Sequence, residues 1–245
     1  MAPKPFLIMQ TGSFSGELSP ITEKYGDMDQ TFLDAAGLGP GEARIWQVFR
    51  DEPLAEPPDA FAGVIITGSS AMLTQPEDWM ETAAAWLRAA VKSATPTLGV
   101  CFGHQLLAHA LGGRVGRNPL GLESGTVDVR LAAKSADDEL FHILPEVAPF
   151  QVHHYESIID LPPGTEVIGF NAHDAFHALR FAPKAWGVQF HPEITADIMR
   201  DLTEIEIAMQ VDATFPYQQV LDGVRETPLG PALLRHFKAV ATGSG

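Results

Sequence analysis

The sequence predicts a single α/β domain with a mostly parallel sheet, helices on both faces and a short antiparallel β extension. Its 245 residues, 45% of them hydrophobic, can bury one substantial core. Four short apolar runs bounded by turns are typical of buried parallel strands, and helical patterns lie between them. These runs cover residues 6–9, 45–49, 64–67 and 97–100.

The helical patterns place the remaining elements around these strands. The clearest helix covers residues 77–91, which follow Pro76 and carry apolar side chains on one face. A second helix is expected over residues 103–111. From Gly125 the pattern changes to short β-like runs, which predict an antiparallel extension or the last strands of the same sheet. Those runs cover residues 126–131, 167–170, 178–181 and 185–190.

The C-terminal part predicts a helical extension, about residues 194–240, on a core of about residues 5–193. Apolar residues near helical spacing follow Glu193 as far as Met209, and a second helical piece covers residues 217–224. We expect both pieces to pack against the domain. The last four residues, 242–245, are expected to be disordered.

Charge and cysteine content exclude several classes of protein. The formal net charge of −15 argues against nucleic acid or an anionic membrane as a partner, because phosphate binding needs a basic face. No apolar stretch is long enough to span a membrane, and the first residues lack the apolar core of a signal peptide. A single cysteine excludes an internal disulfide. A reducing compartment is therefore expected, and we predict a cytoplasmic protein.

Cys101 lies where an apolar strand changes into a helix, between Gly99 and Gly103. An unpaired cysteine is usually a small buried hydrophobe. Here, however, the flanking glycines remove the side chains that would collide in a sharp turn, as in a nucleophile elbow. The thiol would then lie at a helix N-terminus, where backbone N–H groups favour the thiolate.

A second strand-like run ends in His191, with Glu193 two residues later. Side chains two apart on an extended segment point the same way, so the imidazole and the carboxylate can meet. A cysteine nucleophile needs such a pair: the histidine holds and returns the proton, and the carboxylate orients the ring. We therefore predict a Cys101–His191–Glu193 triad at the carboxyl ends of the strands.

These residues resemble the class I (triad-type) glutamine amidotransferases. The resemblance rests on GVCFGHQ at residues 99–105 and QFHPE at residues 189–193, with weaker support from IITGSS at residues 65–70 and VHHYE at residues 152–156. It spans roughly residues 5–193 and implies the flavodoxin-like fold of that family. It is close both to the glutaminase domains of GMP synthases and to stand-alone γ-glutamyl peptidases.

The resemblance also implies roles for residues around the triad. The backbone N–H groups of Phe102 and Ser69 would form the oxyanion hole, with Gly68 giving the loop its turn. Ser69 stands where the commoner Gly-Gly-Pro loop has a glycine, so flipping of this loop would be restricted. Contacts to the substrate are implied for four residues: Gln105, His153, His154 and Tyr155. For His154, a structural role that supports the site is the alternative.

The activity implied is hydrolysis of a γ-glutamyl amide through a thioester on Cys101. Two enzymatic alternatives stay open: a free-standing γ-glutamyl hydrolase, and a glutaminase subunit that delivers ammonia to a synthetase. A non-catalytic binding module is the third. His173 and His177 could share a helix face as metal ligands, but a loop is the preferred interpretation of that segment. We expect a small-molecule substrate, no metal and no cofactor.

Overall fold

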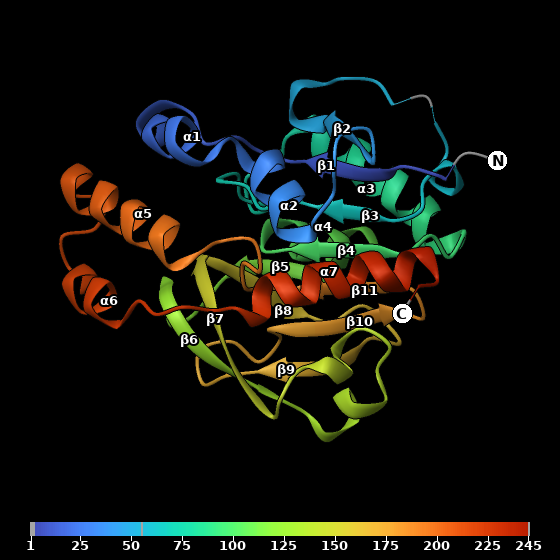
Figure 1. Ribbon diagram of the computed structural model, residues 1–245. Helices are drawn as coiled ribbons and strands as arrows, with labels where there is room; N and C mark the ends of the chain where they lie inside the picture. Colours follow the sequence, from blue (N-terminus) through green and yellow to red (C-terminus); the bar gives the residue numbers. More distant parts are fainter. Residues whose placement is uncertain (1–2, 55, 245) are drawn as a thin grey trace.

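The computed structural model describes residues 3–54 and 56–244, and within them the chain forms a nine-stranded sheet and a separate two-stranded sheet (Figure 1). The strands are β1 Phe6–Gln10, β2 Ala43–Gln47, β3 Val64–Ile66, β4 Thr97–Val100, β5 Arg114–Arg117, β6 Glu123–Leu131, β7 Val147–His154, β8 Glu156–Asp160, β9 Glu166–Phe170, β10 Ala178–Ala182 and β11 Ala185–Val188. The large sheet has the order β2-β1-β3-β4-β11-β10-β9-β6-β7, and β5 pairs with β8.

Helices lie between and after these strands. They are α1 Ser19–Tyr25, α2 Met28–Ala36, α3 Asp78–Lys92, α4 Phe102–Ala110, α5 Ala196–Met209, α6 Tyr217–Gly223 and α7 Leu229–Thr242. The helix expected over residues 77–91 is confirmed as α3, and the one expected after the cysteine is confirmed as α4. None of the helices in the part of the chain that the structure describes is long and apolar enough to cross a membrane.

The two halves of the large sheet differ in direction. Strands β2, β1, β3, β4 and β11 pair in parallel, whereas β10, β9, β6 and β7 continue the sheet as antiparallel neighbours. The α/β class with a parallel core is thus confirmed. The antiparallel extension is larger than expected from the sequence, because the strand β7 joins it through eight residue pairs with β6.

Both faces of the parallel half are buried, which explains why its strands are continuous apolar runs. In β1, Phe6 and Ile8 face one core cluster while Leu7 and Met9 face the other. Helices α2 and α7 supply Phe32 and other apolar side chains to the first cluster, and α3 and α4 supply the second. This arrangement leaves the strand ends as the place where polar side chains can gather.

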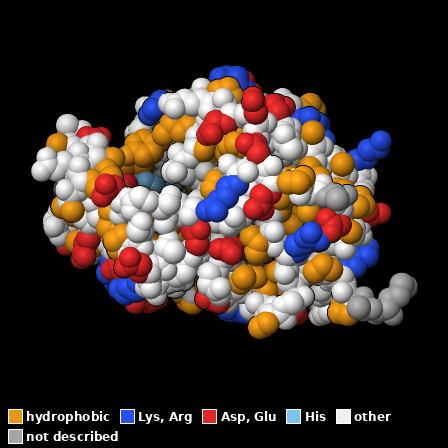
Figure 2. Space-filling view, turned by 90° about the horizontal axis from the view of Figure 1, so that it is seen from above, with side chains coloured by type: hydrophobic (Ala, Val, Ile, Leu, Met, Phe, Trp, Pro, Cys, Tyr) orange, Lys and Arg blue, Asp and Glu red, His pale blue; other side chains and the backbone are white. Residues whose placement is uncertain are grey.

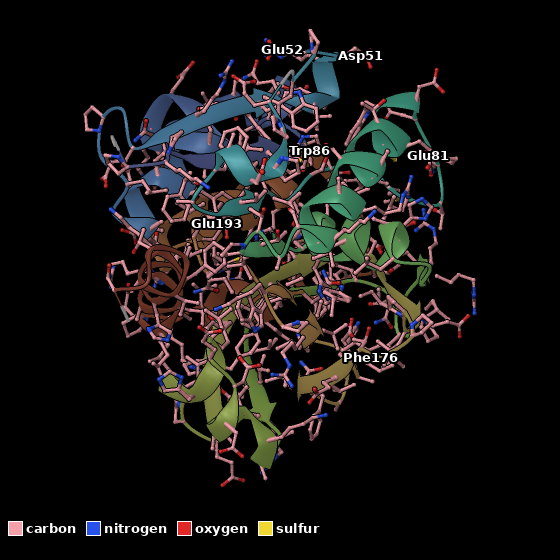
Figure 3. The ribbon with its side chains drawn as sticks, turned by 90° about the vertical axis from the view of Figure 1, so that its right-hand side faces the viewer. Asp51, Glu52, Glu81, Trp86, Phe176 and Glu193 are labelled. Carbon is pink, nitrogen blue, oxygen red and sulfur yellow. The ribbon has the colours of Figure 1, made fainter. Side chains whose placement is uncertain are left out.

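The helix α3 shows how an amphipathic pattern is used. Trp86 lies on its inner side, where its ring meets Trp46 edge-on at 5.7 Å between centroids, while Glu81 points outward (Figure 3). The indole N–H of Trp86 also donates to the backbone oxygen of Glu56 at 3.2 Å. These contacts hold α3 against β2 at the edge of the sheet.

The C-terminal segment has two different positions. The helix α5 packs against α1 and α6, beside the carboxyl ends of the parallel strands (Figure 1). The helix α7 instead lies against the sheet, with Leu233, Leu234 and Phe237 fully buried in the main core. The expected disorder of residues 242–245 is wrong as far as Ser244, whose N–H donates to the backbone oxygen of Ala239 at 2.8 Å. Gly245 lies outside the described residues.

Candidate active site

Three neighbouring strands bring the predicted catalytic groups together. The strands β3, β4 and β11 lie side by side and parallel, so their carboxyl ends meet at one edge. Gly68 follows β3, Cys101 follows β4 and His191 follows β11. The register pairs Val188 with Val100, which aligns the segment carrying the histidine with the one carrying the cysteine.

Cys101 has the backbone of a sharp turn. Its φ of 50° and ψ of −105° are strained for a residue with a side chain, and such values concentrate at functional sites. A Cβ at Gly99 would lie 2.4 Å from the backbone oxygen of Gly103, and one at Gly103 would lie 2.5 Å from that of Ile66. Both glycines are therefore required by close packing, as the sequence predicted for a nucleophile elbow.

The imidazole of His191 is held from one side. Its Nδ1–H donates to Oε1 of Glu193 at 2.7 Å, and its backbone N–H donates to the oxygen of Gln151 at 2.8 Å. Nε2 is then left as the nitrogen that can exchange a proton with other groups. Burial would lower the pKa of His191, but the carboxylate of Glu193 and the sulfur of Cys101 raise it well above its usual value. The ring is thus suited to carrying a proton beside the sulfur.

The loop after β3 has a fixed peptide orientation. The hydroxyls of Thr11 and Thr67 each lie 2.9 Å from the backbone oxygen of Gly68. Because the peptide bond to Ser69 is trans, the N–H of Ser69 points away from these hydroxyls. Among the described residues, neither this N–H nor that of Phe102, the first residue of α4, has a hydrogen-bond acceptor.

Two buried glutamines surround the sulfur. The Nε2 of Gln189 donates to Sγ of Cys101 at 3.6 Å. Gln105 donates through Nε2 to the backbone oxygen of Glu156 at 2.6 Å and to Oε1 of Gln189 at 3.0 Å. Both N–H bonds of Gln105 are used by these contacts, so its carbonyl oxygen is the atom that can meet a substrate amine.

His153 lies on the other side of the cysteine. Its backbone oxygen is 3.7 Å from Sγ of Cys101, and its ring lies between Ser124, 3.0 Å from Nδ1, and Glu206, 3.2 Å from Nε2. Tyr155 follows at the bend between β7 and β8. The ring of His153 borders the cavity, and Glu206 sets its orientation.

His154 is tied into a buried group with Glu123 and His177. Its Nδ1 donates to the backbone oxygen of Glu156 at 3.0 Å, and its Nε2 lies 2.9 Å from Oε2 of Glu123. Nε2 of His177 is 3.1 Å from the same oxygen. Burial would raise the pKa of Glu123, but the two histidines lower it below its usual range. With both ring nitrogens occupied, His154 supports the site instead of meeting substrate through its ring.

Glu123, His154 and His177 are also the described residues that could together ligate a divalent cation, since their ligand atoms lie within 4.8 Å of one another. This group contains His177 but not His173. The segment that carries both is a loop of turns and bends, as the sequence favoured. His104 lies nearby, and burial lowers its pKa to about 3 against the opposing effect of Asp174. Its Nε2–H donates to the backbone oxygen of Phe176 at 3.0 Å.

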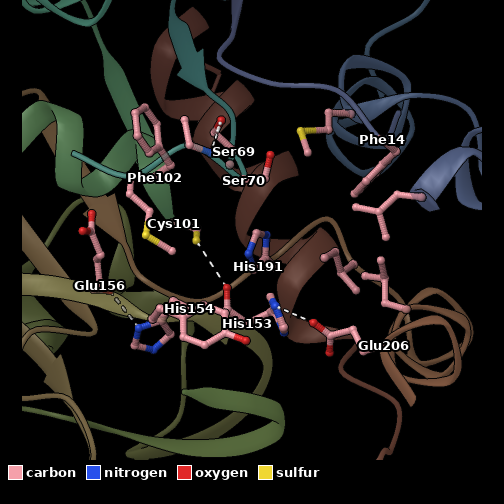
Figure 4. Close-up of a pocket in the computed structure, with 18 of the residues that line it drawn as sticks. Phe14, Ser69, Ser70, Cys101, Phe102, His153, His154, Glu156, His191 and Glu206 are labelled. Atoms are coloured by element: carbon pink, nitrogen blue, oxygen red, sulfur yellow. Dashed lines mark hydrogen bonds and ion pairs between the residues drawn. The ribbon is translucent and has the colours of Figure 1, made fainter. Parts of the chain in front are cut away.

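The ten residues to which the sequence assigned catalytic, oxyanion or substrate-binding roles line one cavity of about 280 Å³, most of whose lining is drawn in Figure 4. They are Gly68, Ser69, Cys101, Phe102, Gln105, His153, His154, Tyr155, His191 and Glu193. From outside, the surface is hollowed on the side of α1 and α5, with a histidine at the bottom of the hollow and hydrophobic side chains along its rim (Figure 2).

Several residues of this region were missed from the sequence. Glu123, which holds His154, is the first residue of β6 and belongs to no motif, and Glu206 lies on a helix surface. Thr11, whose hydroxyl contacts the backbone oxygen of Gly68, is far from Cys101 along the chain and belongs to no recognised motif. Gln189 belongs to the recognised motif, but its contact with the sulfur depends on the pairing of β11 with β4.

The fold and the cavity define an α/β protein in which a cysteine at a strand end, a histidine and a carboxylate face one another. The family model described as glutamine amidotransferase class-I matches residues 45–202, and the chain belongs to that family. The resemblance inferred from the sequence is thereby confirmed.

Individual relatives differ in how much of their length is matched. A glutamine-hydrolyzing GMP synthase subunit of Ignicoccus hospitalis is 33% identical over 139 residues, which cover 56% of this chain and 71% of that protein. Gamma-glutamyl peptidase 4 of Arabidopsis thaliana is 25% identical over 190 residues, covering 75% of this chain and 74% of the relative. The chain spans only 19% of aminodeoxychorismate synthase from Streptomyces griseus.

The solved structure of a glutamine amido transferase from Methylobacillus flagellatus has the same fold. The TM-score is 0.77 at 23% identity, with 99% of this chain and 96% of that chain covered. The single-domain α/β architecture with a mostly parallel central sheet is therefore that of class I glutamine amidotransferase structures.

Proposed function

We propose that the protein hydrolyses a γ-glutamyl amide through a thioester on Cys101 and releases ammonia or an amine. The sulfur attacks the amide carbon, the C–N bond breaks, and His191 gives its proton to the leaving nitrogen. Water then attacks the thioester, the C–S bond breaks, and the proton returns to His191. The observation that carries the proposal is the 2.7 Å bond from His191 to Glu193, in a cavity that Cys101 also lines.

Both steps pass through an oxyanion, for which we propose the N–H groups of Phe102 and Ser69. Removing one such donor typically costs about 3 kcal/mol of barrier stabilisation. The carbonyl of Gly68, held by Thr11 and Thr67, supports an orientation of the Ser69 amide that needs no rearrangement before the reaction. Gly68 itself gives the loop room to pass close to His191.

The test is turnover by the purified protein alone. Ammonia release from glutamine and amine release from a chromogenic γ-glutamyl anilide would be measured for the parent and for Cys101→Ala. The variant should lose activity in both assays while keeping its fold, since alanine suits the turn. 6-Diazo-5-oxonorleucine should label the parent at one site and leave the variant unlabelled. Residual activity within tenfold of the parent would contradict the nucleophile assignment. A parent that hydrolyses neither substrate, with or without a synthetase partner, would favour a binding module.

A second candidate is a glutaminase subunit that supplies ammonia to a separate synthetase. The similarity to a GMP synthase subunit favours it, whereas the broader coverage of a gamma-glutamyl peptidase and the held Gly68 carbonyl favour activity without a partner. Glutamine turnover that is negligible alone and rises by orders of magnitude on adding a GMP synthetase partner would select the subunit role. Because a catalytic thiol must stay reduced, we also propose a cytoplasmic location.

A further inference from the structure

The cavity extends well beyond the groups that the hydrolysis itself requires. Figure 4 shows Phe102 and Glu156 on one side of Cys101 and Phe14 on the other, with His191 between Cys101 and Phe14. Beyond His191, the cavity is bounded by five apolar side chains, which we call the apolar wall: Phe14, Leu18, Met28, Ile194 and Leu202.

The apolar wall is a packed surface and not a set of loose side chains. Phe14, Met28 and Ile194 are at most 8% exposed and belong to one hydrophobic cluster, against which Leu18 and Leu202 pack. This cluster joins the loop after β1 to the start of α5. Its position is fixed in part by Asp27, whose carboxylate accepts from the backbone N–H of Phe14 at 2.7 Å.

The position of the wall relates it to one part of the substrate. Under the proposed function, His191 gives a proton to the leaving nitrogen, so any substituent on that nitrogen lies on the side of His191. The glutamyl part lies on the opposite side, near Gln105. The apolar wall therefore faces the group carried by the leaving amine. Ammonia has no such group, and glutamine would leave the wall uncovered.

The charged side chains around the cavity restrict which leaving amines it can bind. No lysine or arginine lines it in the described parts of the chain, so nothing there matches a carboxylate on the leaving amine. Three glutamates line the cavity, and each contacts a neighbouring group through at least one oxygen: Glu193 with His191, Glu206 with His153, and Glu156 with the backbone N–H of Leu73. The second oxygen of Glu193 is buried and has no partner among the described residues. None of the five side chains of the apolar wall is charged, so an ammonium held against the wall would lose its hydration with no carboxylate on the wall to pair with.

We propose that the apolar wall binds the uncharged hydrocarbon group of the leaving amine, which makes the substrate a γ-glutamyl amide of an alkyl- or arylamine. This inference rests on the proposed function, because it takes its direction from the role of His191. Burial of each additional methylene on the wall should raise kcat/KM roughly fourfold, until the space is filled.

The experiment compares glutamine with three amides whose nitrogen carries a four-carbon group of different charge, all on the parent protein. The substrates are glutamine, γ-glutamyl-n-butylamide, and the γ-glutamyl amides of 4-aminobutyrate and 1,4-diaminobutane. The butylamide should exceed glutamine in kcat/KM by at least about tenfold, and it should also exceed both charged amides. Equal or better use of glutamine, or preference for either charged amide, would overturn the subsite.

A variant pair links the preference to the wall. In Leu202→Ser, the ratio of kcat/KM for the butylamide to that for glutamine should fall several-fold. The same change at Leu33, a partly buried leucine of α2 outside the cavity, should leave the ratio unchanged. An unchanged ratio in Leu202→Ser would remove the wall from substrate binding. If glutamine is hydrolysed without preference, only the subsite fails; if no amide is hydrolysed, the proposed function fails with it.

Discussion

The substitution Gly68→Ala tests the geometry of the site most directly. A Cβ at this position would lie 2.9 Å from Cε1 of His191, whereas ordinary contacts begin at 3.4 Å, so the ring must retreat by about 0.5 Å. Gly68 does not have positive φ, and alanine strains no backbone there. Because a misplacement of about 1 Å can cost about 100-fold in rate, half of it predicts about a tenfold loss of kcat.

The assay has two readouts on the same protein. Steady-state hydrolysis gives kcat and KM. The rate at which iodoacetamide alkylates Cys101, the only cysteine in the sequence, is measured over a range of pH and reports how well His191 still stabilises the thiolate. Gly223→Ala is the matched control, since no atom lies within 4 Å of a Cβ there and its φ is not positive. A kcat within twofold of the parent, at unchanged melting temperature, would refute the argument that the ring position limits catalysis.

Two further predictions concern histidines. His191→Asn should lower kcat nearly as much as loss of Cys101, whereas Glu193→Gln should lower kcat less. Because Glu193 raises the pKa of His191, the alkaline fall of kcat/KM should begin at lower pH in Glu193→Gln than in the parent. An unshifted pH profile would count against the pairing of Glu193 with His191. His104 has a pKa of about 3 when folded and about 6.5 when unfolded, so its stabilising contribution is complete above pH 6.5 and is lost as the pH falls toward 3. Urea unfolding should show a free energy of unfolding that falls as the pH is lowered from 6.5 to 4.5, and this fall should be smaller in His104→Gln; equal slopes in parent and variant would contradict this.

The parallel core and the elbow could be predicted because local patterns specify them. The run before Cys101 is apolar and short, and Gly99 and Gly103 mark the turn whose tight packing requires them. The position of His191 beside Cys101 follows from the general rule that parallel strands end at one edge. These inferences needed no knowledge of distant contacts.

Other parts depend on contacts that no local pattern records. The strand β7 contains Pro149, which would argue against a central strand; it is tolerated because β7 is the edge strand of the large sheet, where Pro149 lies opposite Asp128 in the pairing with β6. The helix α7 carries Pro231 in its first turn, where a proline is tolerated; it lies within the helical extension expected over about residues 194–240, although the sequence pattern did not mark it as a separate helix. The bond from His154 to Glu123 joins residues 31 apart in the sequence, and it appears only once β6 and β7 are paired.

The pairing of β4 with β11 also sets the order in which the site can assemble during synthesis. Gln189 and Cys101, which touch in the folded protein, are 88 residues apart, and the antiparallel half of the sheet lies between them in the chain. The turn after β11 is further covered by α7, where a Cβ at Gly230 would lie 2.6 Å from the oxygen of Pro192. A ribosome-bound chain therefore carries its thiol long before its base.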